Sequence, residues 1–366
     1  MQLIQNIEIK GFRGFKSLTV PKFGKVNLIT GRNNAGKSSL LEAIRILVTH
    51  GSLNTLHEIL DYRDETQKYE KKDRTGFEPY QCLFTGFPSP SAGGIGFSLR
   101  TAGEISSKLP SVTIKTGWAT KQPDSEQVSY KVITEPGGDL VGEPVLAVTV
   151  GKLQRILPLD LLLNRGRPVL RFGPLEDMFE SLPLKYLDPF SSRSTSQLAG
   201  LWDDIALTDV QEEVMKALQL ISPDIQAVAM VGEGKARIAR VRSSQFSSPV
   251  PLRTFGDGIN RLFGIVLSLC NAKGGVLLID EFENGLHYSV QPTIWNMVFR
   301  LANELDVQVF ATSHSEDCVR AFQKAAEDSS EEGVLVRLTR RGEHVFSTEF
   351  DEDELGIATR NDIEVR

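Results

Sequence analysis

The most specific pattern in the chain is a loop bounded by glycines that ends in a lysine and a serine. It reads GRNNAGKS from Gly31 to Ser38, follows the apolar stretch VNLIT and precedes an amphipathic segment. Two glycines let the backbone curl so that successive N–H groups point at one phosphate, and a helix starting there adds its positive dipole end. In this pattern Lys37 reaches the β- and γ-phosphates and Ser38 holds Mg²⁺. The predicted nucleotide contacts are Gly31, Asn33, Asn34, Ala35, Gly36, Lys37, Ser38 and Ser39.

Two acids follow a second apolar run, which reads VLLI over residues 276–279 and continues into Asp280 and Glu281. Open α/β folds bind their ligands at the carboxyl ends of such strands. We therefore expect Asp280 to belong to the Mg²⁺ shell. Glu281 is the expected general base that aligns and deprotonates the attacking water. The alternative is a core strand that ends in a solvated turn.

A glycine-rich turn opens a helix about 20 residues before these acids. It contains Thr254, Gly256, Asp257 and Gly258. A hydroxyl and two glycines at a helix N-terminus form an anion-binding nest. Because one chain needs one phosphate loop per nucleotide, we expect this second nest to close over the γ-phosphate of another subunit. The alternative is an ordinary loop with helix-capping glycines.

A histidine, His314, follows the apolar stretch VQVFA, which we expect to lie beside the carboxylate strand. At a strand end it could donate a hydrogen bond to the γ-phosphate or orient the water. The turn 283–287 after the two acids is a candidate dimer contact. His287, at its end, is equally explained as a residue of a helix's first turn.

Alternating apolar patterns predict the elements that position these residues. Strands are expected at 3–10, 16–20 and 26–30, a helix from Lys37, and a mobile loop over 61–79. An antiparallel β layer is expected over 80–150, helices over 174–222, and strands at 225–231 and 236–242. Strand–helix alternation from Asp257 onward predicts a parallel sheet with covering helices and a closing hairpin.

The predicted fold class is α/β, with a mixed or parallel central sheet, an antiparallel β layer and a helical insertion. The expected divisions fall into four ranges. Residues 1–60 carry the phosphate loop, 61–151 the β layer, 152–250 a helical and β insertion, and 251–366 the second lobe.

The order of these motifs resembles that of ABC-type ATPase heads. The chain looks like the bacterial "AAA family ATPase" group related to OLD-family and SMC-type ATPases, and its IKGFRGFKSL segment resembles the opening of that group. The resemblance implies a P-loop fold, ATP and Mg²⁺ as ligands, Arg13 near the nucleotide, and a homodimer that sandwiches two ATP molecules. It also makes Thr254, Gly256 and Gly258 a signature acting in trans and His314 a switch residue.

The chain also departs from relatives of that group. TFGDG stands where transporter ATPases have LSGGQ, no long coiled coil interrupts the chain, and DEDEL at 351–355 is too isolated for a nuclease module. The resemblance therefore implies an anti-phage or DNA-maintenance ATPase whose effector is a separate chain. Gln81 and Gln154 are both candidates for the glutamine that links metal and inserted lobe.

Composition bounds the remaining possibilities. The 366 residues carry a net charge of −6, and three unpaired-looking cysteines argue against a zinc site or a disulfide framework. We expect a cytoplasmic protein with no membrane partner. DNA binding stays open, because six arginines could form a basic patch; the alternative is that they are scattered, solvated surface charges. These residues are Arg165, Arg167, Arg171, Arg237, Arg240 and Arg242. A nucleotide sensor with negligible turnover is the main alternative to an ATPase.

Overall fold

The computed structural model describes residues 2–65, 78–87, 94–102, 108–122, 129–133, 142–158, 179, 182–189, 195–232, 237–351 and 354. The predicted acidic turn at 351–355 and the candidate patch residues Arg165, Arg167 and Arg171 lie largely or wholly outside these ranges. Within them, no helix is both long and apolar enough to cross a membrane.

A six-stranded sheet forms the centre of the molecule. Five of its strands run parallel in the order β15-β3-β14-β13-β9, and β16 pairs antiparallel with β15 at one edge. Strands buried on both faces read as continuous apolar runs, which is how the inner strands read. The bounds are β3 Val26–Thr30, β9 Leu184–Leu187, β13 Val276–Ile279, β14 Gln308–Thr312, β15 Gly333–Arg341 and β16 His344–Phe350.

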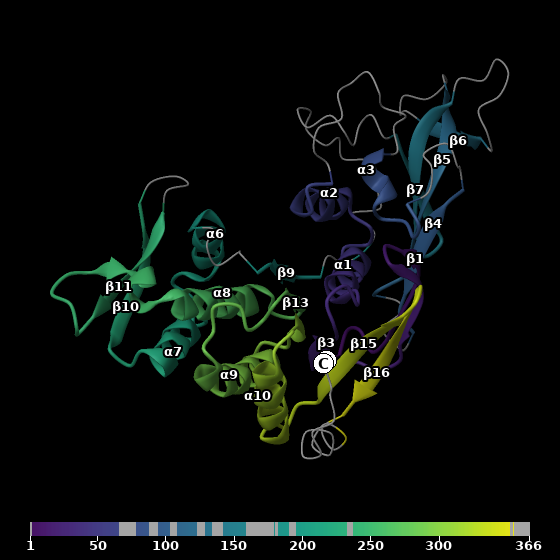
Figure 1. The fold of residues 1–366 in the computed structure, drawn as a ribbon. Coiled ribbons are helices and arrows are strands. Elements are labelled where there is room, and N and C mark those ends of the chain that lie inside the picture. The colour runs from purple at the N-terminus through teal and green to yellow at the C-terminus, as the bar shows by residue number, and fades with distance from the viewer. Residues whose placement is uncertain are drawn as a thin grey trace.

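Helices cover one face of this central sheet (Figure 1). Leu277 and Ile279 of β13 point to this side, where one hydrophobic core joins the sheet to the helices. Trp295 and Phe282 stack at its middle with ring centroids 3.8 Å apart. The helices are α6 Thr195–Ile205, α7 Gln211–Ile221, α8 Asp257–Asn271, α9 Gln291–Glu304 and α10 Glu316–Glu327, with short 3-10 turns at Leu252–Phe255 and Tyr288–Val290.

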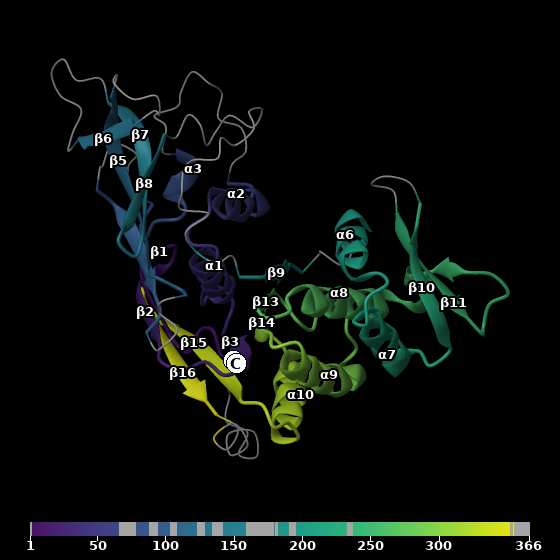
Figure 2. The ribbon, with the colours of Figure 1, turned by 180° about the vertical axis from the view of Figure 1, so that it is seen from behind.

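Helix α1 lies between the opposite face of the central sheet and a second, antiparallel sheet (Figure 2). That sheet has the order β2-β1-β4-β5-β7-β8, with β6 on β5. A second hydrophobic core fills the space around α1. The bounds are β1 Ile7–Phe12, β2 Phe15–Val20, β4 Gly96–Arg100, β5 Val112–Gln122, β6 Ser129–Ile133, β7 Glu143–Val150, β8 Leu153–Pro158, α1 Lys37–Val48, α2 Leu53–Tyr62 and α3 Glu78–Gln81.

A third, small sheet lies at the opposite end of the molecule from the antiparallel layer in both views. It is built from β10 Ile225–Val231, β11 Ile238–Ser243 and β12 Val250–Pro251. Its inner face packs on α6 and α7 through Ile225, Val228 and Val241.

Most expected elements are present, and five elements of the structure differ from the prediction. Strand β1 begins at Ile7 rather than at residue 3. Helix α2 extends to Tyr62 and α3 begins at Glu78, so the loop predicted over 61–79 overlaps both. Strands β8 and β9 were not predicted. The hairpin β7–β8 crosses the division expected at residue 151, and β9 places part of the expected insertion 152–250 in the central sheet.

Candidate active site

The phosphate-loop sequence folds into a tight curl between β3 and α1. Three of its residues have positive φ: Gly31 at 140°, Asn34 at 63° and Gly36 at 101°. Glycine and asparagine are the residue types that adopt this region most readily, so the sequence matches the backbone it must form. Asn33 and Asn34 are exposed, Ala35 is buried, and Ser38 and Ser39 are half-buried.

Both sheets hold this loop in place. A Cβ on Gly31 would lie 2.4 Å from the carbonyl oxygen of Leu338 on β15, and one on Gly36 would lie 2.6 Å from the ring of Phe15 on β2. Arg340 Nε donates a hydrogen bond to the carbonyl of Asn34 at 2.9 Å. The backbone carbonyl of Leu338 therefore excludes a side chain at Gly31, whereas a side chain at Gly36 would have to displace the Phe15 ring.

Lys37 lies at the centre of the loop and is buried, with 6% of its surface exposed. Its Nζ donates to the carbonyl of Gly31 at 2.7 Å and that of Arg32 at 3.2 Å. Burial lowers the pKa of Lys37 below its ordinary value, and the nearby carboxylates of Asp280, Glu283 and Glu281 act against that shift. The ammonium of Lys37 therefore lies close both to the phosphate loop and to the acidic residues that follow β13.

The end of β13 brings Asp280 to the start of α1. Asp280 Oδ1 accepts a hydrogen bond from Ser38 Oγ at 3.2 Å and one from Thr312 Oγ1 at 2.5 Å. Its carboxyl is buried, with 5% exposed. Strands β3, β13 and β14 thus bring a serine, a carboxylate and a threonine to one point, as expected at the carboxyl ends of parallel strands.

Glu281 has a strained backbone. Its φ is 51°, a left-handed value that is rare for a residue other than glycine or asparagine. Its N–H donates to Thr312 Oγ1 at 2.9 Å, and the next N–H, of Phe282, donates to the carbonyl of Thr312 at 2.9 Å. These bonds to β14 fix the turn that carries Glu281.

His314 lies beside Lys37, and both side chains were expected from the sequence to reach the γ-phosphate. Its Nδ1 is 3.1 Å from Lys37 Nζ, and its backbone N–H donates to Glu283 Oε1 at 2.7 Å. Because an ammonium can only donate, this contact assigns the proton of a neutral imidazole to Nε2. The remaining ring nitrogen is then a donor.

The turn with Thr254, Gly256, Asp257 and Gly258 lies at the N-terminus of α8. Thr254, Gly256 and Asp257 are exposed. A Cβ on Gly258 would lie 3.0 Å from the carbonyl oxygen of Gly285, so this turn packs against the turn that follows the two acids. Within one chain, the glycine turn therefore packs against residues 283–285, which follow the two acids.

Arg261, one helical turn further along α8, makes the strongest link between these elements. Its guanidinium donates to the carbonyls of Asp188 at 2.8 Å, Asp280 at 2.8 Å and Glu281 at 2.9 Å. Burial lowers its pKa to about 10, opposed by the same acids. Our sequence analysis did not predict Arg261 as a site residue. The available signal was a lone arginine in the apolar helix segment INRLFGIVLSL.

Arg13 lies in a cluster of ion pairs behind α1. Its guanidinium pairs with Glu42 of α1 at 2.5 Å and with Glu65 at 2.8 Å, and only 8% of the residue is exposed. Its φ is 48°. The structure thus gives Arg13 carboxylate partners within the chain, and its contact with nucleotide stays a prediction.

The other candidates fall outside this arrangement. His287 accepts a hydrogen bond from the N–H of Ser289 at 3.3 Å and so caps the short 3-10 turn Tyr288–Val290, and its place at a dimer contact stays a prediction. Arg237 pairs with Asp203 at 2.5 Å. Arg240 and Arg242 are exposed on β11, Gln154 is exposed on β8 and Gln81 ends α3. Among the described residues, no group of three His, Cys, Asp or Glu could hold a metal.

Comparison with known proteins shows which domains and folds this chain resembles. Residues 1–78 match the family model described as "AAA ATPase domain", and residues 170–317 match "AAA domain, putative AbiEii toxin, Type IV TA system". The solved SmcHead bound to the C-winged helix domain of ScpA aligns with 95% of this chain and 98% of its own, with a TM-score of 0.54 and 13% identity. Two parts of the chain thus resemble AAA ATPase domains, and its fold is that of an SMC head, which confirms the predicted α/β P-loop fold class.

Curated relatives narrow this class. A Helicobacter pylori protein named "ATP/GTP phosphatase" is 25% identical over 346 residues, covering 88% of both chains. The DNA replication and repair protein RecF of Limosilactobacillus reuteri is 27% identical over 189 residues, which are 50% of this chain and 39% of that protein. The chain is thus similar to an ATP/GTP phosphatase over most of its length and to RecF over half of it, whereas a relation to the OLD family stays a prediction.

Proposed function

We propose that this chain binds Mg·ATP between two copies of itself and hydrolyses it, using nucleotide-driven dimer closure as a switch. One observation carries the proposal. Ser38, Asp280 and Thr312 meet within hydrogen-bonding distance, while Lys37 and His314 meet beside them. These side chains come from three different strand ends, so their convergence is a property of the fold rather than of one local sequence.

The residues at this point fit a magnesium ion. Mg²⁺ prefers oxygen ligands and is usually held by one or two protein groups together with phosphate oxygens and water. Ser38 Oγ and Asp280 Oδ1 are such groups and already lie 3.2 Å apart. A bound Mg²⁺ would neutralise charge on the phosphate oxygens as the bond to the leaving group breaks.

The remaining side chains divide the work of hydrolysis. Lys37, held by burial and by the loop carbonyls, binds the phosphates. Glu281, on its strained turn, accepts the proton of the attacking water. His314 donates from Nε2 toward the γ-phosphate region while its backbone is held by Glu283. Thr312 orients both acids, since it donates to Asp280 and accepts from the N–H of Glu281.

The second half of each site is proposed to come from the partner copy. Thr254, Gly256 and Asp257 are exposed at the N-terminus of a 15-residue helix, whose first N–H groups suit an anion. Within one chain this turn packs against residues 283–285 instead. A nucleotide bound at one copy's loop is therefore proposed to meet the other copy's glycine turn.

A bacterial defence or DNA-maintenance system, with a separate effector protein, is the proposed setting. The family description that names a type IV toxin–antitoxin system and the partial similarity to RecF support it. Two alternatives remain as proposals: a nucleotide sensor or scaffold with negligible turnover, and a DNA-binding repair ATPase of SMC type.

The test is single-turnover ATP hydrolysis and mass in solution with Mg·ATP, for the wild type and for Glu281→Gln. We expect Glu281→Gln to bind ATP, to lose at least about a hundredfold in hydrolysis rate, and to accumulate as a dimer. Glu304→Gln, an exposed carboxylate on α9 paired with Arg300, is the matched control and should behave as wild type.

Each other outcome has a definite meaning. A Glu281→Gln protein that hydrolyses ATP at the wild-type rate would refute the assignment of the base. Hydrolysis without any ATP-dependent change in mass would refute the dimer. If neither protein turns ATP over although both bind it, the sensor alternative replaces the enzyme.

A further inference from the structure

The two edges of the central sheet have different surroundings. Strand β16 forms one edge, where Ser347 Oγ donates a hydrogen bond to the carbonyl of Thr19 on β2 at 2.7 Å. The antiparallel layer therefore lies against this edge. Strand β9 forms the other edge, and both views place it between α1 and α6 (Figure 1, Figure 2). An open edge strand presents N–H and C=O groups with which another strand can pair.

Strand β9 uses one side of its backbone for β13. The carbonyl of Leu187 accepts a hydrogen bond from the N–H of Asp280 at 2.9 Å. Because the backbone groups of successive residues point to opposite sides of a strand, those of Leu184 and Tyr186 point away from β13. Within the described part of the chain, these outward groups have no hydrogen-bond partner. The edge is therefore open to a further strand.

A groove of about 350 Å³ lies alongside β9, between this strand and helices α6 and α8. Leu187, Leu198 and Leu201 give it apolar walls, and Lys185 and Asp204 contribute one charge of each sign. Its volume is at the lower end of the range for ligand sites, which is roughly 300–1,000 Å³. An apolar group without net charge suits this lining.

A glycine in the middle of α6 keeps the groove open. Gly200 lines the groove, and a Cβ on it would meet no atom within 4 Å. Gly275 shows the contrast, since its Cβ would lie 1.9 Å from the carbonyl oxygen of Pro183. Glycine inside a helix is destabilising relative to alanine, and packing within the chain does not require it at Gly200. A glycine there is useful where a second backbone approaches the helix closely.

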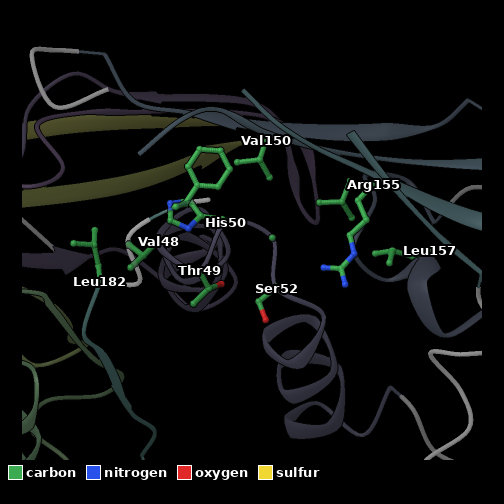
Figure 3. A pocket seen from close by; sticks show the side chains of 11 residues that line it. Val48, Thr49, His50, Ser52, Val150, Arg155, Leu157 and Leu182 are labelled. Atoms are coloured by element: carbon green, nitrogen blue, oxygen red, sulfur yellow. The ribbon is translucent and has the colours of Figure 1, made fainter. Parts of the chain in front are cut away.

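Contacts on the side of α1 hold β9 in place. Leu182, just before the strand, lines a cavity of about 220 Å³ at the end of α1 together with Val48 (Figure 3). The Arg45 guanidinium lies 5.0 Å from the ring centroid of Tyr186, and Tyr62 packs against the same ring with centroids 6.3 Å apart. Because these contacts already order the strand, a partner that pairs with it loses little free energy in ordering β9.

We propose that an extended segment of a partner protein binds along β9 as a further strand of the central sheet. The backbone of the segment pairs with Leu184 and Tyr186, and one of its apolar side chains enters the groove beside Leu198. A small apolar molecule would leave the N–H and C=O groups of the edge unpaired, so the edge and the groove together favour a polypeptide. Only β9 then separates the segment from the strand that carries Asp280. This docking site lies outside the proposed ATP hydrolysis and does not depend on it.

The test selects binders from a phage-displayed library of random heptapeptides on the full chain without nucleotide, and the enriched peptides are synthesised. Fluorescence polarisation should show that Gly200→Leu weakens their binding at least about tenfold, because the leucine fills the groove. Glu212→Leu, which places the same side chain on the exposed face of α7, is the matched control and should keep wild-type binding. Gly200→Leu should unfold at a temperature no lower than that of the wild type, because leucine favours a helix more than glycine does.

N-methylation of the selected peptides tests the pairing with β9 directly. Only alternate residues of an added strand direct their N–H groups to the strand beside it. Methylation of those N–H groups should weaken binding at least about tenfold, whereas methylation of the intervening ones should leave it unchanged.

The proposal fails if no peptide is enriched on the wild type, if the selected peptides bind Gly200→Leu equally tightly, or if methylation at both sets of positions has the same effect. ATP hydrolysis plays no part in these measurements, so failure of this docking site is distinguishable from failure of the proposed function.

Discussion

The central sheet and the antiparallel layer are built on opposite principles. Strands β3, β13 and β14 are buried along their whole length, with residues such as Leu28, Leu278 and Phe310 inaccessible to solvent. The second half of β2 in the layer alternates instead, with Leu18 and Val20 buried and Thr19 exposed. A parallel sheet covered on both faces has only its strand ends free for polar chemistry.

This difference separates the part of the molecule that carries the candidate site from the part that supports it by packing. Ser38, Asp280 and Thr312 all lie at or just beyond carboxyl ends of the parallel strands. The layer contributes close packing instead, through Phe15 against the phosphate loop and through β5 and β7 against Gly51. We therefore expect changes at the strand ends to affect nucleotide handling, and changes in the layer to affect stability.

The largest effect should follow Lys37→Ala. Loss of charge-assisted bonds to phosphate should weaken ATP binding by about two orders of magnitude. Folding should not suffer, because burial already disfavours the charged lysine, as its lowered pKa indicates. Fluorescent-nucleotide titration and thermal unfolding check this, with Lys16→Ala on β2 as control. If Lys37→Ala unfolded the protein, strand-end residues would also be needed for stability, which would contradict the expected separation.

Arg261→Met should affect both properties, because it removes donors from three carbonyls at once. We expect about 2–4 kcal/mol of lost stability, together with a fall in kcat of about tenfold or more. KM for ATP should change little, since Arg261 contacts the acids' backbone and not the loop. Steady-state kinetics with urea unfolding test it. A raised KM at unchanged kcat would contradict this positioning role.

Gly51→Ala should reduce stability alone. A Cβ there meets Val148 and Val112 at a φ of 67°, so we expect a loss of about 2 kcal/mol. Gly274→Ala is the matched control, because its φ is 73° but nothing lies within 4 Å, and it should lose only about 1 kcal/mol. ATP turnover per folded molecule should equal the wild type in both. A turnover defect specific to Gly51→Ala would show that the layer takes part in the chemistry.

The smallest effect concerns pH. His50 has a lowered pKa when folded, so between that value and 6.5 the unfolded chain binds more protons. Stability should therefore fall as pH drops below about 6.5, by at most about 1.4 kcal/mol per pH unit. Urea unfolding at several pH values should show this contribution missing from His50→Gln and retained in His344→Gln, an exposed control. An identical pH dependence in all three proteins would refute it.

The sequence predicted elements whose signals are local. Strand β3 has the expected bounds, and helices α1 and α8 begin at the expected residues, because an apolar run or a helical stripe is bordered there by glycine or a motif. Strand β9 was missed because four residues containing Lys185 and Tyr186 show no periodicity. It becomes a strand only by pairing with β13, about 90 positions later in the chain.

The candidate site, like the fold, was predictable where the sequence signal is local. Motif spacing pointed to Lys37, Asp280 and His314 as neighbours, and the structure brings them together. No local sequence pattern indicated that Arg261 donates to backbone carbonyls at the ends of two strands, β9 and β13. That depends on how α8 packs on the sheet, which is a tertiary property.

The neighbours of β3 also have a consequence for biosynthesis. Strand β3 pairs with β14 and β15, and the loop after it is held by Leu338 and by Arg340, which lies 306 positions beyond its partner Asn34. On a ribosome the phosphate loop emerges well before both strands beside it. A nascent chain that ends at α8 would thus contain the loop and lack its flanking strands. We expect such a chain to lack a formed phosphate site, so that nucleotide capture waits for the synthesis of β14 and β15.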